Sequence, residues 1–275
     1  MPEGDTIFRA ARTLHRALAG QTVTRFETVL PRLQRIHDDM SITGRTIEEV
    51  SSSGKWMTIR FSGGLILLTH MLMSGSWHIY RPGERWQRPR RDMRIVISTA
   101  DFEAVAFTVP VAEFHTAASL ARRQGFNQLG PDVLSAGFDE RQAIANLCAQ
   151  PDLEVAEALL RQHVLAGLGN VYKSEVCFAC GINPFRMVAT LTDEETNCLV
   201  QTARRLMSRN VSDTSEARIV TYTGLRRTTG RAHPGERLWV YGRAGQPCRR
   251  CKTPVQSRKQ GREARVTFWC PACQR

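Results

Sequence analysis

The first residues of the chain, Met1-Pro2-Glu3-Gly4-Asp5, place an amine beside a carboxylate, a pair that can do covalent chemistry. Initiator methionine is normally removed when a small residue such as proline follows it, and removal leaves the secondary amine of Pro2 as the N-terminus. An α-amino group has a pKa of about 7.7–8.0, against about 10.4 for lysine, so roughly a tenth of it is neutral and nucleophilic at pH 7. Such an amine can attack an acetal or aldehyde carbon and form an iminium, while Glu3 donates or accepts the accompanying protons. Met-Pro-Glu is also simply a common beginning for a protein.

Four cysteines near the other end have the spacing of metal ligands. The pairs Cys248-x2-Cys251 and Cys270-x2-Cys273 are separated by 18 residues. This spacing predicts a zinc ribbon with four thiolate ligands, a closed structural site in which one Zn²⁺ contributes the folding free energy of a short segment. Four basic residues between the pairs belong to an expected β-hairpin: Arg258, Lys259, Arg262 and Arg265.

The charge of the chain favours a polyanionic partner. The 275 residues include 38 Lys+Arg and 26 Asp+Glu, a net charge of +12. Residues 243–275 hold nine Lys/Arg and one acidic residue, which gives +8 of this total. Nucleic acid is therefore favoured over a membrane as the partner. No membrane span or signal peptide is expected, which predicts a cytoplasmic protein associated with the nucleoid through DNA. The remaining cysteines, Cys177 and Cys180 among them, are then expected to be core residues rather than disulfides.

The elements that position these residues follow from periodicity. Asp5 is expected to cap a helix that ends at Gly20, with apolar residues at 3–4 residue spacing that hold the N-terminus in place. Strands are expected at residues 23–30, 45–51, 56–61, 65–71, 77–80, 94–98 and 104–109, with a hairpin at Ser62-Gly63-Gly64. Helices are expected at residues 138–148, 153–165, 171–180 and 192–209, the last with a Thr192–Glu195 capping box. The pattern predicts an antiparallel β-sandwich followed by a helical domain.

Three further segments are candidate nucleic-acid contacts. Lys55 follows a Ser/Gly-rich turn at a strand start, where it can meet a phosphate, although a lysine there is more often an ordinary surface residue. Leu72 and Met73 lie on an expected loop where apolar side chains can wedge into a base stack, although such residues are usually core. The turn Gly167-Leu168-Gly169-Asn170 directly precedes a helix whose free amides favour an anion, and an ordinary helix–turn–helix corner is its alternative.

Taken together, the motifs resemble the formamidopyrimidine-DNA glycosylase and endonuclease VIII family. The matching stretches are Met1-Pro2-Glu3-Gly4, Gly54-Lys55, Gly130-Pro131-Asp132-Val133-Leu134, Ala166-Gly167-Leu168-Gly169-Asn170 and the four terminal cysteines, in the family's order. The resemblance implies an α+β, multidomain fold: an N-terminal helix with a two-layer antiparallel β-sandwich, a helix–two-turn–helix domain and a C-terminal zinc finger. The expected segments are residues 1–118 for the sandwich, 119–135 for a linker, 136–242 for the helical domain and 243–275 for the zinc finger.

The resemblance also implies roles for individual residues. Pro2 is similar to the nucleophile that attacks C1′ of a damaged nucleotide, and Glu3 to the acid/base that protonates the sugar oxygen. Lys55, Asn170 and Arg265 are similar to residues that hold DNA phosphates. Leu72 and Met73 occupy the loop that fills the gap left by a flipped base. The implied activity is a bifunctional glycosylase/lyase of base excision repair, acting as a monomer on damaged duplex or single-stranded DNA and cleaving the strand by β- and δ-elimination.

The sequence departs from the family pattern at two places, and the second bears on the substrate. Position 6 is Thr6, so a second carboxylate is missing there, and there is no Arg-Arg-Phe-Gly intercalation loop of the formamidopyrimidine branch; residues 111–114 are the nearest stretch. This absence and Gly4 favour the endonuclease VIII branch, whose substrates are oxidised pyrimidines. Two other functions remain open: a damaged-DNA-binding zinc-finger protein without catalysis, and an unrelated zinc-ribbon nucleic-acid binder.

Overall fold

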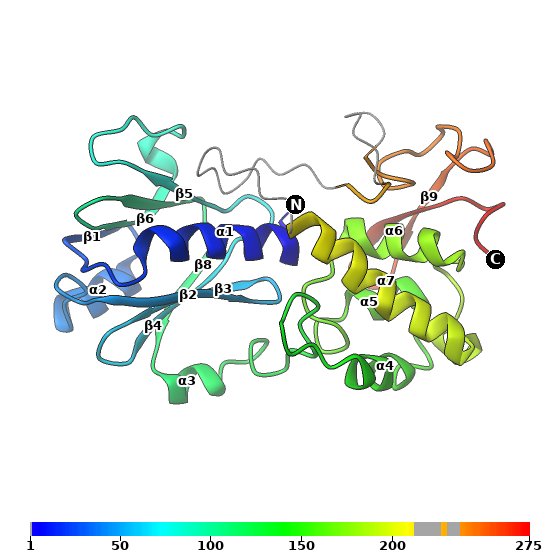
Figure 1. The fold of residues 1–275 in the computed structure, drawn as a ribbon, viewed down its shortest axis with the longest axis horizontal. Helices are drawn as coiled ribbons and strands as arrows, with labels where there is room; N and C mark the ends of the chain where they lie inside the picture. The colour runs from blue at the N-terminus through cyan, green and yellow to red at the C-terminus, as the bar shows by residue number, and fades with distance from the viewer. Residues whose placement is uncertain (1, 212–226, 230–236) are drawn as a thin grey trace. The chain divides into compact units, whose positions relative to one another are not determined.

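A computed structural model describes residues 2–211, 227–229 and 237–275, so Met1 lies outside the described residues (Figure 1). The described residues form two compact units, residues 2–127 and the described residues from 128 onwards. The expected α+β class, with antiparallel sheets followed by helices and a hairpin between the two cysteine pairs, is confirmed. Among the described helices, none combines the length and the apolar character needed to cross a membrane.

Two four-stranded antiparallel sheets form the first unit, in the orders β1-β6-β7-β5 and β2-β3-β4-β8. Inward-facing residues of both sheets, such as Ile59, Leu67 and Trp77, are fully buried in one shared core. The strands are β1 (Arg25–Thr28), β2 (Ile47–Ser53), β3 (Trp56–Phe61), β4 (Leu65–His70), β5 (Ser76–Tyr80), β6 (Met93–Ser98), β7 (Glu103–Phe107) and β8 (Val111–His115).

The predicted hairpin at Ser62-Gly63-Gly64 joins β3 to β4. Phe61 pairs with Leu65 across it, and Gly63 and Gly64 have φ of 79° and 75°. Positive φ at consecutive positions is readily adopted only by glycine, so these two residues fix the turn and with it the register of the central strand pair.

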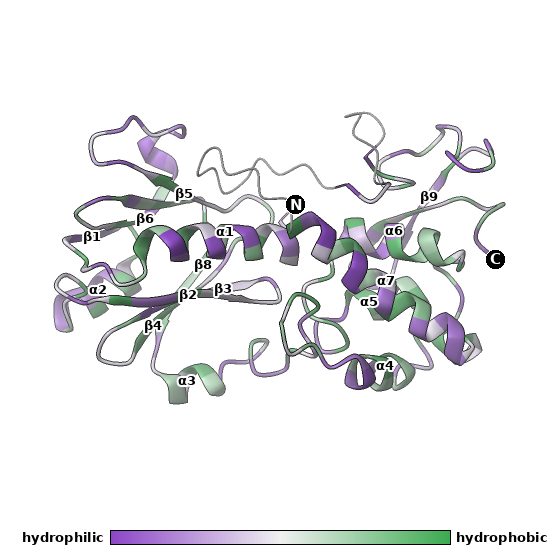
Figure 2. Ribbon diagram, in the orientation of Figure 1, coloured by the Kyte–Doolittle hydropathy of each residue, from purple (hydrophilic) through white to green (hydrophobic). Residues whose placement is uncertain are grey.

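Helix α1 (Gly4–Leu18) packs on β2 with one apolar face. Ile7, Ala10, Leu14 and Leu18 are buried, and hydrophilic residues follow the other face (Figure 2). The expectation that Asp5 caps this helix is wrong by two residues: the N-cap is Glu3. Asp5 lies in the first turn, where it is fully buried and its Oδ1 accepts a hydrogen bond from the backbone N–H of Thr6 at 2.8 Å.

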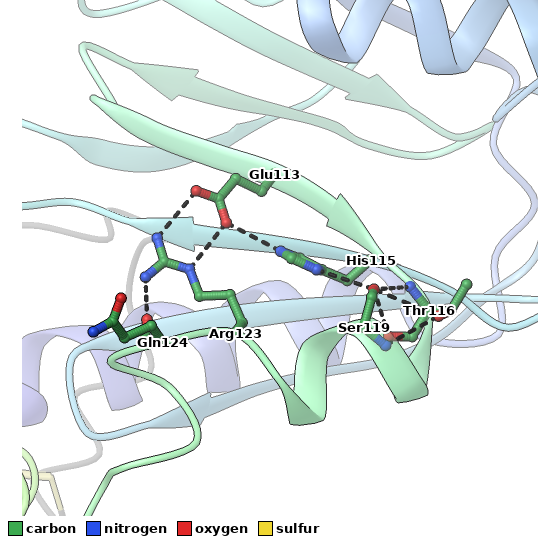
Figure 3. Close-up of polar contacts among 6 residues, drawn as sticks. All are labelled: Glu113, His115, Thr116, Ser119, Arg123 and Gln124. Carbon is green, nitrogen blue, oxygen red and sulfur yellow. Dashed lines mark hydrogen bonds and ion pairs between the residues drawn. The ribbon is translucent and has the colours of Figure 1, made fainter.

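Several elements of the first unit were not expected from the sequence. They are α2 (Pro31–Asp39), η1 (Arg90–Asp92), β8 and α3 (Ala117–Ala121). Figure 3 shows how polar contacts join the last two: Glu113 of β8 accepts hydrogen bonds from Arg123 Nη2 and Nε, each at 3.0 Å, and also contacts His115 Nε2 at 3.0 Å. Thr116 and Ser119 form a capping box at the start of α3.

The second unit packs its helices around a separate core. Leu147, Leu159, Tyr172 and Leu199 are fully buried in it. The expected Thr192–Glu195 capping box is confirmed by reciprocal hydrogen bonds of 3.0 and 3.2 Å. The elements are α4 (Glu140–Cys148), α5 (Val155–Leu160), α6 (Asn170–Cys180), η2 (Val188–Thr190), α7 (Asp193–Val211) and the antiparallel hairpin β9 (Gln256–Gln260) and β10 (Arg265–Trp269), of which β9 is hydrophilic (Figure 2).

The two internal cysteines have different environments. Cys177 is fully buried, as expected of a core residue, and burial raises the pKa of its thiol to about 12. Cys180 instead forms a disulfide with Cys198, with a Cα–Cα distance of 6.1 Å, which joins α6 to α7. The core assignment of Cys180 is therefore corrected, because the packing of two helices brings together cysteines that lie 18 residues apart in sequence.

Candidate active site

Pro2 and Glu3 directly precede α1, and both are buried. The Glu3 carbonyl accepts hydrogen bonds from Thr6 and Ile7 at 2.9 and 3.1 Å, so the backbone of this pair is continuous with the first helical turn. Because the apolar face of α1 lies in the sandwich core, the nitrogen of Pro2 is attached to a rigid element. The structure thus supports the N-terminus in the way that an N-terminal nucleophile requires.

Lys55 lies in the two-residue turn between β2 and β3, and its side chain is partly exposed. This turn and the start of α1 lie at the same end of the sandwich (Figure 1). His70, the last residue of β4, is paired in register with Trp56 directly after Lys55. Burial, followed by the positive charges of Lys55 and Arg123, lowers the pKa of His70 to about 4. His70 is therefore neutral at pH 7 and lies within electrostatic reach of the lysine, a proximity that the sequence analysis did not identify.

Leu72 and Met73 are exposed in the turn between β4 and β5, with exposed fractions of 48% and 59%. They are two of five large apolar side chains exposed among the described residues. The turn begins directly after His70, whose Nδ1 accepts a hydrogen bond from Leu72 N–H at 3.0 Å. The predicted exposure on a loop is thus confirmed, and insertion into DNA stays a prediction.

In the second unit, the two glycine-containing motifs of the sequence are hydrogen-bonded to each other. Ala166 N–H donates to the Pro131 carbonyl at 3.0 Å, and Val133 N–H donates to the Ala166 carbonyl at 3.2 Å. Gly130 allows the close approach, because a Cβ there would lie 2.3 Å from the His163 carbonyl oxygen. These contacts fix the turn that leads into α6.

Asn170 begins α6 and lies beside the hairpin. Its Nδ2 donates to the Val266 carbonyl of β10 at 3.0 Å, and its buried Oδ1 has no hydrogen-bond partner in the structure. The next residue of the hairpin toward its tip is Arg265, whose guanidinium pairs with Glu263 at 2.9 Å. The structure therefore brings together Asn170 and the backbone beside Arg265, two segments that the sequence analysis assigned separately to DNA phosphates.

Arg265 lines a cavity of about 270 Å³ between the helices and the hairpin of this unit. Its lining includes Arg161, Lys173, Arg262 and Arg265, with Glu157 and Glu263 as the acidic residues. Lys173 is only 1% exposed, and the sequence analysis did not single it out because a lysine in a helix is usually on the surface. Four cations against two carboxylates make the cavity suitable for an anion.

The four C-terminal cysteines form a cluster that can hold a metal ion. Their Sγ atoms all lie within 4.8 Å of one another, with Cys248–Cys273 at 3.9 Å and Cys251–Cys270 at 3.4 Å. Tetrahedral coordination with Zn–S bonds of about 2.3 Å places sulfur atoms roughly 3.8 Å apart. The residues present therefore fit a four-coordinate ion with no position left for a substrate.

Comparisons with known proteins agree with this arrangement. A model of the formamidopyrimidine-DNA glycosylase N-terminal domain matches residues 1–110, and a model of the H2TH domain of the same glycosylase matches residues 129–221. The chain is 41% identical to a probable endonuclease 8 2 of Streptomyces coelicolor, over 100% of this chain and 94% of the relative. It is 40% identical to the DNA-(apurinic or apyrimidinic site) lyase Nei2 of Mycolicibacterium smegmatis, over 100% and 99% of the two chains.

The fold is also that of a solved relative. The Fpg protein of Lactococcus lactis, in complex with DNA containing an abasic site, superposes with a TM-score of 0.81 at 23% identity, over 99% of each chain. At this identity the superposition supports the fold alone, whereas the sequence relatives cover the whole chain at a much higher identity. The chain belongs to the formamidopyrimidine-DNA glycosylase and endonuclease VIII family, with relatives named for the endonuclease VIII branch.

Proposed function

We propose that this protein is a bifunctional DNA glycosylase/AP lyase of base excision repair that uses the nitrogen of Pro2 as its nucleophile. The observation that carries the proposal is the position of Pro2 and Glu3, buried directly before a helix anchored in the sandwich core, in a chain of this family. An amine at the end of a flexible tail would lack this fixed geometry, and fixed geometry is a large part of catalysis.

The chemistry proceeds through an iminium. The lone pair of Pro2 N bonds to C1′, and the electron pair of the glycosidic bond leaves with the damaged base, which takes up a proton. Glu3 protonates the sugar ring oxygen as the ring opens, which leaves the cationic iminium. Loss of a C2′ proton then expels the 3′ phosphate (β-elimination), loss of a C4′ proton expels the 5′ phosphate (δ-elimination), and water releases Pro2.

Phosphate binding falls to the basic residues of both units. Lys55 beside neutral His70 supplies a cation at the end of the sandwich that carries Pro2. In the second unit, Arg265 and Lys173 line a predominantly cationic cavity, and Asn170 binds the hairpin backbone at Val266, the residue after Arg265. Such contacts position the strand and carry no base specificity. We infer that Zn²⁺ is the ion of the cysteine cluster, since four thiolates in tetrahedral reach favour it.

The preferred lesions are proposed to be oxidised pyrimidines. Two features support this preference: Gly4 is present, and an Arg-Arg-Phe-Gly stretch is absent. The nearest stretch, residues 111–114, lies in strand β8, and only residues 108–110 connect β7 to β8. A panel of duplexes, each with one defined oxidised base, tests this preference. Equal or faster excision of oxidised purines would contradict it and leave the lyase chemistry unaffected.

Borohydride trapping tests the nucleophile. Incubation with abasic-site DNA and borohydride is expected to give a covalent adduct whose peptide map locates the DNA on Pro2, with Met1 absent by mass. A non-cleavable N-terminal extension should abolish the adduct, and Pro2→Gly should reduce it strongly. An adduct on a lysine, or an unaffected extended protein, would overturn the assignment of Pro2. Binding to damaged DNA with no adduct at all would identify a binding protein without catalysis.

A further inference from the structure

Two turns of the sandwich contain strained residues. Among the described residues, four other than glycine have positive φ: Leu72 at 45°, Thr108 at 46°, Lys252 and Ala264. A left-handed backbone is unfavourable for L residues, and for a β-branched residue such as threonine it is an outlier. Such conformations persist where surrounding contacts enforce them, and they cluster at functional sites. Leu72 and Thr108 lie in the β4–β5 and β7–β8 turns, which contact each other.

Thr108 joins the two turns directly. Its Oγ1 donates to the Ser74 carbonyl at 2.7 Å, and its backbone N–H donates to the Asp92 carbonyl at 2.7 Å. Asp92 ends η1 in the segment that connects β5 to β6. Three segments far apart in sequence therefore meet at residue 108, and the strained backbone of Thr108 is what directs its hydroxyl and its N–H to separate partners.

Arg88 completes this junction from the β5–β6 segment. Its Nη1 lies 3.2 Å from Thr108 Oγ1 and 3.4 Å from both the Ser74 carbonyl oxygen and Ser76 Oγ. Its Nη2 pairs with Asp92 at 3.2 Å, which orients the planar guanidinium. Arginine can hold several acceptors in one fixed fork, whereas lysine is a point charge on a flexible chain. The Arg88 side chain is 31% exposed, so the surrounding segments cover about two thirds of it.

The other end of the β4–β5 turn is equally constrained. Leu72 N–H is bound to His70 Nδ1 at 3.0 Å. Gly75 closes the turn so tightly that a Cβ would lie 2.7 Å from the Met71 carbonyl oxygen and 3.1 Å from Val109 Cα. Contacts thus hold both ends of the turn, while the side chains of Leu72 and Met73 at its tip are exposed.

We propose that Arg88, with Thr108, is a positioning residue that holds the Leu72–Met73 turn in the shape needed to enter a DNA base stack. The inference rests on the proposed function, because it assigns the turn to damaged DNA. Inserting an apolar side chain between bases requires unstacking, and a turn that is already ordered loses less conformational entropy in doing so. Arg88 itself does not contact DNA; it affects insertion only by holding the turn in shape.

Comparing duplex and single-stranded substrates tests the proposal. Arg88→Met is expected to lower kcat/KM on an abasic site in duplex DNA by about tenfold, the factor for a free-energy change of about 1.4 kcal/mol. A single-stranded abasic oligonucleotide has no stacked partner strand to enter, so there the decrease in kcat/KM should be less than about twofold. Arg91→Met is the matched control, since this exposed arginine lies three residues further along the same segment and its loss changes the net charge equally.

A spectroscopic measurement separates positioning from loss of charge. The fluorescence of 2-aminopurine next to the abasic site reports unstacking, and Arg88→Met should reduce its rise while Arg91→Met does not. Thr108→Val, which removes the bond to Ser74 without a change in charge, should give a smaller loss in the same direction, and Arg88→Lys should restore only part of the signal. Equal losses for Arg88→Met on both substrates, or equal effects of the two arginine variants, would overturn the inference. A wild-type protein inactive on both substrates would instead overturn the proposed function.

Discussion

The sandwich of residues 2–127 and the cysteine segment of residues 243–275 anchor their site residues by different interactions. In the sandwich, the elements that carry Pro2 and Lys55 pack on one large core with Ile59, Leu67 and Trp77 at its centre. The hairpin that carries Arg265 has only a small cluster that includes Val240, Val255 and two of the clustered cysteines. So short a segment cannot bury enough apolar surface to hold a fixed conformation without other interactions.

Polar anchors replace the missing core in the cysteine segment. One anchor holds the residues that directly precede the segment. Glu175 of α6 is fully buried and accepts hydrogen bonds from the backbone N–H groups of Trp239, Val240 and Tyr241 at 2.8, 2.9 and 2.9 Å, and another from the Thr228 hydroxyl. Gln260 of the hairpin donates to Glu154 at 2.8 Å. The position of Arg265 therefore depends on a few specific polar interactions, whereas the position of Pro2 depends on many apolar contacts. Single substitutions should for this reason affect the two regions unequally.

Removal of the ion proposed for the four-cysteine cluster should have the largest effect and should separate the two regions. A strong chelator, or Cys273→Ser, is expected to unfold the cysteine segment, because structural zinc contributes on the order of 10–16 kcal/mol in small zinc domains. Hydrogen exchange followed by mass spectrometry should show loss of protection in residues 256–269 and unchanged protection in residues 56–70. DNA affinity should fall by more than about 100-fold, because unfolding of the segment displaces Arg265.

A matched control for this experiment is Cys148→Ser. Cys148 is exposed and lies outside the four-cysteine cluster, so its substitution should leave metal content and protection unchanged. Loss of protection in both regions after chelation would contradict the independence of the sandwich from the metal.

Glu175→Gln should have the next largest effect. An amide presents one acceptor oxygen and a donor NH2 group to a ring of N–H and O–H donors, so some of these buried donors lose their partner. The expected cost is about 3–5 kcal/mol of the free energy of unfolding of the second unit, measured by urea denaturation. Glu263→Gln, an exposed acidic residue of the hairpin, is the control and should cost less than about 1 kcal/mol. Similar values for the two variants would show that Glu175 is not an anchor.

Local sequence patterns were enough to predict much of this fold. Alternating strands, the two glycines at residues 63 and 64, and the Thr192–Glu195 box each depend on a few neighbouring residues, and the structure confirms them. The cysteine cluster was predictable for the same reason, since each pair is local and only one long connection separates the pairs. Helix α2 was missed although Pro31 at its first position is a start signal, because the surrounding strand pattern took precedence.

Contacts between distant segments could not be predicted. The Cys180–Cys198 disulfide depends on how α6 packs on α7, and Lys173 is buried in a helix that packs on strand β10. Arg88 shares no motif with Ser74 or Thr108, and only the meeting of three turns gives it a role. Motifs therefore identified the residues proposed to touch DNA, whereas their supports became visible only in three dimensions.

Truncation of the sandwich core should have a moderate effect that the metal does not modify. Leu67→Ala removes a fully buried side chain at the centre of β4 and is expected to lower the free energy of unfolding by about 2–5 kcal/mol. Thermal unfolding of the first unit should shift equally with and without chelator. A shift that depends on the chelator would show that the stability of the sandwich depends on the ion of the cysteine cluster, which contradicts the independence of the two regions.

Acidification should produce the smallest effect, and it should arise in the sandwich. His78 is buried between Ser76 Oγ at 3.0 Å and the Tyr80 hydroxyl at 3.1 Å, and burial, followed by the charge of Arg88, lowers its pKa to about 4. In the unfolded chain this histidine takes up its proton near pH 6.5, whereas in the folded protein it does so only near pH 4. The contribution of neutral His78 to the free energy of unfolding is therefore fully present above pH 6.5 and is lost as the pH falls toward 4. His78→Asn should be less stable at pH 7, yet its stability should fall less steeply over this range, by at most about 1.4 kcal/mol per pH unit for one proton. His70 contributes in the same direction and keeps part of the slope in the variant. Identical slopes for the two proteins in urea denaturation at several pH values would exclude His78 as a source of acid sensitivity.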